Sequence, residues 1–281
     1  MLNCELSLDF NYCRPVRRSA ERSTDIDLTP EQVERYGRQL TLPGMSEEAQ
    51  ARLLAARVLV LGLGGSGTAA ALLLAQAGVG HIRLMDPAAV SREDVQFQAL
   101  YTRADVGRAR GQAAKLRLAR LSTGSKFDYV EGKLSAHTAE DIIDPNDVVV
   151  DSLDDWQDKL LASDACMKTW RPLVHAGVTA FNFQIFTMVP GKSACLRCVF
   201  SQVGLEDVPT SKTESGRFEP VCTMAGSFQA LETIKLIARL GASAADEIVT
   251  FDGLRRTLQS THGLTPRVDC PDCGRRLQGE R

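Results

Sequence analysis

The chain has 281 residues, 44% of them hydrophobic, and a formal net charge of −2. This length and composition allow one large core, so a single α/β domain with a small appendage fits better than two equal domains. The absence of a polybasic block and of a long apolar run argues against nucleic acid or a membrane as a partner. Glu5 and Asp9 stand where a secretory leader would be basic and then apolar, which indicates a cytoplasmic protein.

The first elements are readable from their capping residues. Residues 1–28 mix charged and polar side chains with little periodicity, and we expect a mobile N-terminal arm there, whose role is not readable. Thr29, Pro30 and Gln32 together form a strong helix start, and this helix should run to about Leu40. Ser46 can cap a second helix over residues 47–56.

The stretch 57–86 reads as strand, glycine-rich turn, helix and strand. Residues 58–61 are all apolar, which is typical of a strand buried on both faces of a parallel sheet. A glycine cluster at residues 62–67 precedes good helix formers up to Ala77, and a second strand at residues 81–85 ends at Asp86. Glycines let the backbone approach a phosphate, helix N–H groups favour an anion, and a terminal carboxylate can accept ribose hydroxyls. The pattern predicts a nucleotide fold without specifying the nucleotide; the alternative is that the glycines merely turn the chain.

The remaining chain alternates between helices and strands. Residues 87–105 form a polar segment without clear periodicity, and such segments are often functional. Asp151–Asp155 follows a buried strand, at the edge where parallel sheets bind ligands. From Cys195 to Thr223 no secondary structure is strongly indicated. Helices are expected at residues 107–121, 138–142, 156–170 and 224–240, and strands at 126–130, 148–150, 172–176, 183–189 and 247–251, the last as the final inner strand.

Four of the eight cysteines form two C-x-x-C pairs, Cys195 with Cys198 and Cys270 with Cys273. Each pair can aim two thiolates at one ion, and together they predict a tetrahedral structural zinc site with no open position for catalysis. A redox dithiol or unpaired thiols are the alternative, which would leave the second pair without a purpose. The zinc would hold the C-terminal tail against the outgoing strand.

Two weaker features need context. Arg35 and Arg38 lie one helical turn apart before the glycine-rich unit, and spacing alone favours a solvated basic face. Cys222 lies in the polar stretch just before the expected helix at residues 224–240, where a helix dipole could lower the pKa of its thiol and make it a nucleophile. Taken alone, Cys222 is more simply an ordinary cysteine.

The order of these features resembles the ThiF/MoeB/HesA family, bacterial relatives of the ubiquitin-activating enzymes. The resemblance covers roughly residues 28–273 and rests on several segments, namely RYGRQLTLPG, VLVLGLGGSGTAAALLLAQAGVGHIRLMD, DVQFQ, VVVDSLDD, CLRC, CTMAGSFQALETIKLI and CPDC. It implies a Rossmann-like, doubly wound, mostly parallel α/β sheet with antiparallel C-terminal strands and a structural zinc site. It also implies one adenylation domain over residues 29–281, with a crossover loop at about 199–223 and a zinc-binding tail.

Family members use Mg²⁺ and ATP to adenylate the C-terminal carboxylate of a small ubiquitin-like, β-grasp carrier that ends in Gly–Gly, often for sulfur transfer. By resemblance Gly62, Gly64 and Gly65 line the nucleotide, Asp86 holds the ribose and Asp154 positions Mg²⁺. Arg38 matches an arginine that reaches the triphosphate of a neighbouring subunit, which implies a homodimer. Cys222 falls near the crossover-loop cysteine that in some members links covalently to the carrier.

The sequence departs from the family pattern within the nucleotide site. In the cluster usually written S-N-L-Q-R-Q, which here ends at Gln98, Asp94 replaces the asparagine and Phe97 replaces a phosphate-binding arginine. Arg110 stands where a lysine is usual, and Asp155 adds a second acid next to the expected metal. A lost cation and added acids predict weaker ATP handling, unless a nearby arginine substitutes. The arginines considered for this are Arg92, Arg103 and Arg108.

Three functions are compatible with these residues. The first is adenylation of a ubiquitin-like sulfur carrier or related peptide in cofactor or natural-product biosynthesis, with a sulfur donor as a further partner. The second is a catalytically reduced scaffold that keeps fold, zinc and dimer but binds its partner without adenylating it, as Asp94, Phe97 and Asp155 suggest. The third is an NAD-dependent dehydrogenase, in which the four cysteines would have no purpose.

Overall fold

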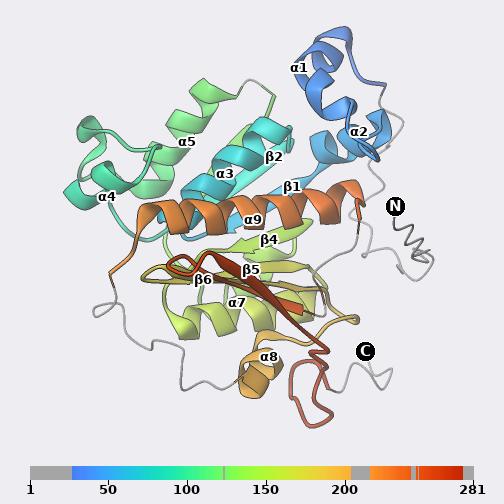
Figure 1. Ribbon diagram of the computed structural model, residues 1–281. Coiled ribbons are helices and arrows are strands. Elements are labelled where there is room, and N and C mark those ends of the chain that lie inside the picture. Colours follow the sequence, from blue (N-terminus) through green and yellow to red (C-terminus); the bar gives the residue numbers. More distant parts are fainter. Residues whose placement is uncertain (1–26, 123, 204–215, 242–244, 246, 275–281) are drawn as a thin grey trace.

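The computed structural model describes residues 27–122, 124–203, 216–241, 245 and 247–274. The expected N-terminal arm therefore lies outside the described residues, except for Asp27 and Leu28. Residues 204–215 of the expected crossover loop also lie outside them. The described chain forms one eight-stranded sheet with helices on both faces (Figure 1).

The sheet has the strand order β3-β2-β1-β4-β5-β6-β7-β8. The strands from β3 to β5 pair in parallel, whereas β6, β7 and β8 pair antiparallel. This confirms the Rossmann-like, mostly parallel sheet with antiparallel C-terminal strands. The strands are β1 Arg57–Leu61, β2 His81–Met85, β3 Lys126–Val130, β4 Val148–Asp151, β5 Leu173–Thr179, β6 Asn182–Met188, β7 Glu247–Asp252 and β8 Thr257–His262.

The central strand β1 is buried on both faces, as its apolar run predicts. Val58 and Val60 belong to one hydrophobic cluster, and Leu59 and Leu61 belong to another on the opposite face. The first face is covered by α2 Glu47–Ala55, α3 Gly65–Ala77, α5 Arg110–Leu121 and α9 Glu219–Ala238, and the second by α6 Ala139–Ile143, α7 Trp156–Thr169 and α8 Leu196–Val203 (Figure 1). The core thus consists of two layers around the sheet.

The strand order reverses between β1 and β4, which makes their carboxyl ends the topological switch point where open α/β sheets bind ligands. Gly62, directly after β1, has a φ of 85° and lies against the backbone of Ser152, directly after β4. The turn is therefore packed tightly at this edge.

Sequence reasoning misses four elements. The strand predicted at residues 247–251 is the last inner strand, as expected, but the edge strand β8 follows it, and all residues of β8 are exposed. Residues 87–105 contain the short helix α4 Arg92–Phe97, which Ser91 and Asp94 cap, and a 3-10 helix at Arg103–Asp105. Cys195 directly precedes α8 and Cys198 lies within it, although the polar residues nearby do not indicate a helix.

Helix α1, Pro30–Leu40, begins with the expected capping box and packs with α2 against the carboxyl end of α3. Both helices therefore lie at the end of α3 opposite to the glycine turn (Figure 1). A search of the described helices for a stretch with the length and apolar character of a membrane span found none.

Candidate functional site

Two cavities meet at the switch point. The smaller has a volume of about 110 Å³ and the larger of about 540 Å³. The smaller is lined by Asp86, Arg110, Lys133, Asp155 and Asp158, among others. Both are lined by Gly64, Ser152, Leu153 and Asp154. Groups bound in the two cavities would therefore meet beside Asp154.

The three glycines predicted to line the nucleotide have different roles in the fold. Gly62 needs its left-handed backbone, and a Cβ there would strike the Ser152 carbonyl. At Gly65 a Cβ would lie 2.6 Å from Cβ of Cys222. At Gly64 a Cβ would meet no described atom within 4 Å, and Gly64 lines both cavities. The open space beside Gly64 is thus where a ligand can approach the backbone.

Arg110 links two carboxylates at the smaller cavity. Its Nε and Nη2 donate to Asp94 over 3.0 and 2.7 Å, and its Nη1 lies 3.5 Å from Asp86. Burial tends to lower the pKa of Arg110, but the two carboxylates raise it overall, so the guanidinium stays charged. The negative charge that Asp94 adds to the site is therefore neutralised by a bidentate ion pair with Arg110.

Asp86 holds the glycine turn. Its Oδ2 accepts from the Leu63 backbone N–H over 2.7 Å, and its Oδ1 accepts from that of Ala88 over 2.8 Å. A carboxylate has about four acceptor sites, so Asp86 retains capacity for ribose hydroxyls in the cavity that it lines. The ribose role remains a prediction.

The loss of the family arginine at position 97 is not made good by the arginines considered from sequence. Phe97 is 43% exposed and is absent from the described lining of both cavities, as are Arg92, Arg103 and Arg108. Gln98 donates to Asp94 over 3.1 Å and so supports the Arg110 pair. The lining includes a cation that sequence reasoning missed, Lys133, whose Nζ lies 3.7 Å from Asp158. Sequence reasoning weighed only arginines as replacements for the missing cation, and it therefore missed Lys133.

Asp154 and Asp155 have separate surroundings. Asp154 accepts from Nη2 of Arg217 over 2.8 Å, and each of these two side chains is 42% exposed. Asp155 caps α7, because its Oδ1 accepts from the backbone N–H groups of Gln157 and Asp158. Sequence reasoning missed Arg217, which is distant in sequence and carries no motif.

Cys222 does not have the environment predicted from sequence. Helix α9 begins at Glu219 rather than near Met224, so Cys222 lies inside the first turn of the helix, and it is 4% exposed. Burial, reinforced by the charge of Glu219, raises the pKa of Cys222 to about 11. The structure therefore contradicts the hypothesis of a lowered pKa, because neighbouring side chains cover Cys222, and it agrees with the simpler interpretation of an ordinary cysteine.

The larger cavity extends over the face of the antiparallel strands that α9 does not cover. Ile185 and Val249 belong to the cluster beneath α9, and their neighbours on the same strands line the cavity. These neighbours are mainly hydroxyl and amide side chains, namely Thr179, Asn182, Gln184, Thr250, Thr257, Gln259 and Thr261. Over these strands a second substrate would therefore meet uncharged hydrogen-bonding groups, whereas Trp156 and Phe200 add apolar surface elsewhere in the cavity.

Asp151, Lys159 and His175 form a buried cluster of polar and charged side chains, and Lys159 and His175 also line the larger cavity. Asp151, 0% exposed, accepts from Nδ1 of His175 over 2.7 Å and lies 3.4 Å from Nζ of Lys159. Burial tends to raise the pKa of Asp151, but Lys159 and His175 lower it overall. Burial also lowers the pKa of His175, and Lys159 adds to this, so the imidazole is neutral. The sequence signal for this pair was weak, because it consists only of Lys159 eight positions after Asp151.

Arg38 is the predicted site residue that the structure does not bring to the site. It is exposed on α1, beyond the carboxyl end of α3, and it is absent from the described lining of both cavities. Within a single chain it has no access to the nucleotide site.

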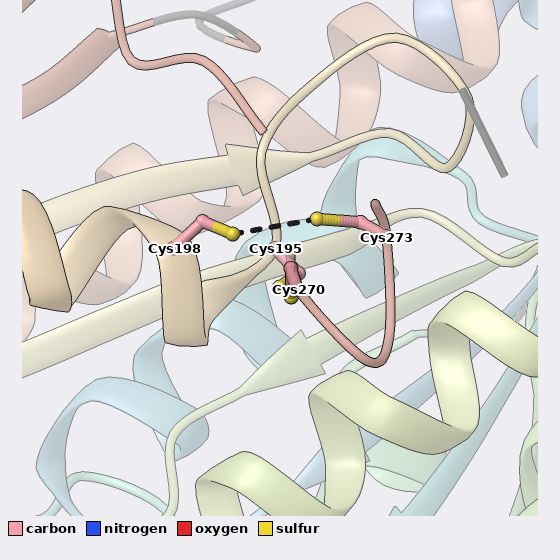
Figure 2. A group of neighbouring side chains, drawn as sticks. All are labelled: Cys195, Cys198, Cys270 and Cys273. Carbon is pink, nitrogen blue, oxygen red and sulfur yellow. Dashed lines mark hydrogen bonds between the residues drawn. The ribbon is translucent and has the colours of Figure 1, made fainter. Parts of the chain in front are cut away.

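The four predicted zinc ligands lie together. Their sulfur atoms are within 4.8 Å of one another, and Cys195 and Cys270 are 3.6 Å apart while Cys198 and Cys273 are 3.4 Å apart (Figure 2). Zinc–sulfur bonds of about 2.3 Å in a tetrahedron place sulfurs about 3.8 Å apart. Four buried thiols at these separations fit Zn²⁺, and the ion would join α8 to the C-terminal tail.

The fold and the paired cavities define a Rossmann-type nucleotide-binding protein with a four-cysteine cluster. The chain matches the model of the ThiF family over residues 36–272, and it belongs to that family.

Several curated relatives are similar over most of the chain. "Adenylyltransferase and sulfurtransferase MOCS3" of Bos taurus is 36% identical over 249 residues, which is 89% of this chain and 55% of the relative. "SAMP-activating enzyme E1" of Haloferax volcanii is 29% identical, covering 89% of this chain and 92% of the relative. The chain thus spans about half the length of the MOCS3 relatives.

Solved structures show the same fold. A crystal structure of Escherichia coli MccB with MccA-N7isoASN aligns with a TM-score of 0.77 and 22% identity, covering 85% of this chain and 75% of MccB. A structure of PaaA aligns with a TM-score of 0.72 and 18% identity, covering 87% of this chain and 78% of PaaA. At these identities the likeness concerns the fold alone.

Proposed function

We propose that this chain uses Mg²⁺ and ATP to adenylate the C-terminal carboxylate of a ubiquitin-like sulfur carrier protein or a related peptide. The observation that carries the proposal is the meeting of two cavities at Gly64 and Asp154, one with charged groups suited to a nucleotide and one with space for a peptide. The names of the MOCS3 and SAMP-activating relatives support the adenylation of such a carrier.

The charged lining of the smaller cavity suits part of an ATP molecule, and the remainder of the nucleotide would extend beyond its volume of about 110 Å³. Asp86 offers acceptors for the ribose, Gly64 offers open backbone, and Arg110 and Lys133 supply positive charge. The carboxylates of Asp154 and Asp158 line the same cavity, and oxygen ligands of this kind are those that Mg²⁺ prefers. When bound, Mg²⁺ would neutralise charge that develops on the phosphates.

The larger cavity suits the tail of the carrier. In the reaction a carboxylate oxygen forms a bond to the α-phosphorus, the bond from that phosphorus to the oxygen bridging to the β-phosphorus breaks, and pyrophosphate leaves with the bonding electrons. A tail laid over β6–β8 can form hydrogen bonds with Gln184, Thr250 and Gln259 and end beside Asp154. An adenylated tail could then accept sulfur from a separate donor.

A second copy of the chain completes the proposal. Arg38 is exposed on α1, and α1 lies at the end of α3 opposite to the glycine turn (Figure 1). We therefore propose a homodimer in which Arg38 of each copy serves the nucleotide cavity of the other. Mixing an Arg38→Ala variant with an Asp154→Asn variant, each inactive alone, should restore part of the activity in the mixed dimer.

Pyrophosphate exchange is the main test. The protein is incubated with Mg·ATP, labelled pyrophosphate and carriers ending in Gly–Gly, and label is expected to enter ATP only when a carrier is present. Absence of exchange with every carrier, despite tight binding of Mg·ATP, would contradict the proposal.

A ligand comparison separates the other two functions. Mg·ATP at one hundred times its Kd should raise unfolding free energy by about 2.7 kcal/mol, whereas NAD should have no effect. Protection by NAD alone would favour a dehydrogenase. The exposed Phe97 favours the scaffold alternative, and for a scaffold neither nucleotide should protect the protein.

A further inference from the structure

The positive charges around the two cavities are unequally available. Arg110 is engaged by Asp94 and Asp86, and Lys159 is buried against Asp151 and the Ala176 carbonyl. Arg217 also lines the larger cavity, where 42% of its side chain is exposed. Among the described cations lining that cavity, the guanidinium of Arg217 is thus more accessible than the ammonium of Lys159.

The fold holds Arg217 in place from its backbone. Gly216 accepts from the Ala180 N–H over 3.0 Å, and Arg217 forms an isolated parallel bridge with Ala180 at the turn between β5 and β6. Phe218 packs against Phe181 with ring centroids 5.3 Å apart. These contacts hold the backbone of Arg217 beside that turn, and its guanidinium pairs with Asp154 in the lining of the larger cavity.

We propose that Arg217 is the receptor for the carboxylate of the incoming peptide tail, and that its ion pair with Asp154 reserves it until Mg·ATP binds. This inference rests on the proposed function, and it assigns the carboxylate subsite within the larger cavity. A guanidinium is a planar fork that matches a carboxylate in two-pronged geometry. Arg217 lines the larger cavity and is absent from the described lining of the smaller one, which places it on the side of the tail rather than that of the ribose.

Competition for Asp154 sets the order in which the two substrates bind. Arg217 and a metal ion would both use Oδ1 or Oδ2 of Asp154, so binding of Mg·ATP weakens the ion pair. The released guanidinium can then accept the tail carboxylate. Two anions must approach each other in the reaction, and a cation on the attacking side reduces their repulsion.

The first experiment measures Mg·ATP binding without any tail. Isothermal titration of Arg217→Ala is expected to show two- to fivefold tighter binding than the wild type, because an exposed ion pair of roughly 0.5–1 kcal/mol no longer competes for Asp154. If Arg217 instead contacts the triphosphate, the same variant binds Mg·ATP more weakly, and the proposal is overturned.

The second experiment uses a peptide ending in Gly–Gly, as free acid and as C-terminal amide, titrated into protein saturated with Mg²⁺ and a non-hydrolysable ATP analogue. The wild type should prefer the acid by about 10–100-fold, as expected for a charge-assisted hydrogen bond, and Arg217→Ala should lose the preference. Arg217→Lys should recover part of it. An Arg217→Ala variant that keeps the full preference refutes the inference.

Lys168→Ala is the matched control, since Lys168 also forms an exposed ion pair, with Glu140 over 3.0 Å, away from both cavities. It should change neither titration. In pyrophosphate exchange, Arg217→Ala should raise the KM for the carrier, whereas the KM for ATP should stay the same or fall. If the wild type exchanges with no carrier, the proposed function fails, while the Mg·ATP titrations still decide whether Arg217 competes for Asp154.

Discussion

The two cavities differ in how their charges are arranged. In the smaller one, Arg110 is already held by Asp86 and Asp94, so a ligand meets groups fixed by one another. In the larger one, the sheet face offers hydroxyls and amides, and the partly exposed ion pair of Arg217 and Asp154 also belongs to the lining. Under the proposed function, the difference means that the nucleotide would meet charges already paired with one another, whereas the second substrate would meet many uncharged hydrogen-bonding groups.

Removing the four-cysteine cluster should break the larger cavity while sparing the smaller one. A Cys270→Ser/Cys273→Ser double variant is expected to lose zinc and much of its thermal stability, because structural zinc contributes on the order of 10 kcal/mol in small zinc domains. Helix α8 carries Phe200, which lines the larger cavity, so tail binding should fall while Mg·ATP binding persists. Metal analysis, thermal unfolding and both titrations check this.

Cys166→Ala is the control for that variant, because Cys166 is another fully buried thiol in the same hydrophobic cluster. It should retain zinc and tail binding. Loss of Mg·ATP binding together with the zinc would show that the two cavities are not independent.

Lys159→Met tests the buried contacts of Asp151 with Lys159 and His175. It leaves the Asp151 carboxylate with the neutral His175 and the Leu153 backbone N–H as partners, and removal of one partner from a buried ion pair costs about 3–5 kcal/mol. Urea unfolding should show this loss. Lys168→Met, on the exposed side of the same helix, should stay within about 0.5 kcal/mol of the wild type. Equal values for both variants would mean that Lys159 does not stabilise this buried cluster.

Two glycine variants sharpen the comparison at the wall that both cavities share. Gly62→Ala should destabilise the protein by about 1–3 kcal/mol, because φ is 85° and a Cβ meets the Ser152 carbonyl. Gly64→Ala should cost less than about 0.5 kcal/mol, since φ is −78° and the space is open, yet weaken Mg·ATP binding about tenfold. Thermal unfolding and titration separate these outcomes, and nucleotide binding unaffected at position 64 would remove Gly64 from the site.

Cys222 should matter least. Cys222→Ser is expected to keep pyrophosphate exchange within about twofold of the wild type, because a thiol whose pKa is about 11 is protonated at neutral pH. Its alkylation, followed by mass spectrometry of the peptide that contains it, should be slow at pH 7 and accelerate as pH rises toward the pKa and the thiolate fraction grows. Rapid labelling at pH 7 would restore the nucleophile hypothesis.

The parallel half of the fold is predictable because its signals are local. The apolar run of β1, the glycine turn and the helix formers of α3 lie together in the sequence, and each matches its element. Strand β8 is missed because TLQSTH has no apolar face to bury, and all its residues are exposed. Helix α8 is short and adjoins polar residues, so its composition gave no clear signal.

The site is only partly predictable, because its charges pair across the fold. The sequence identifies Asp94, Arg110 and Asp154 as members of the site, but the Asp94–Arg110 pair requires α4 and α5 to be folded against each other. Arg217 reaches Asp154 only through the turn between β5 and β6. Likewise, the burial that raises the pKa of Cys222 depends on where α9 begins.

The cysteine cluster fastens Cys195 and Cys198 to Cys270 and Cys273. Helix α9 and strands β7 and β8 all lie between these two attachment points in the chain, and they supply Cys222, Thr250 and Gln259 to the larger cavity. Asp86 and Arg110 lie outside that loop. A thiol oxidant or a strong chelator should therefore uncouple the two substrates, so that the protein still recognises its nucleotide but no longer responds to its carrier.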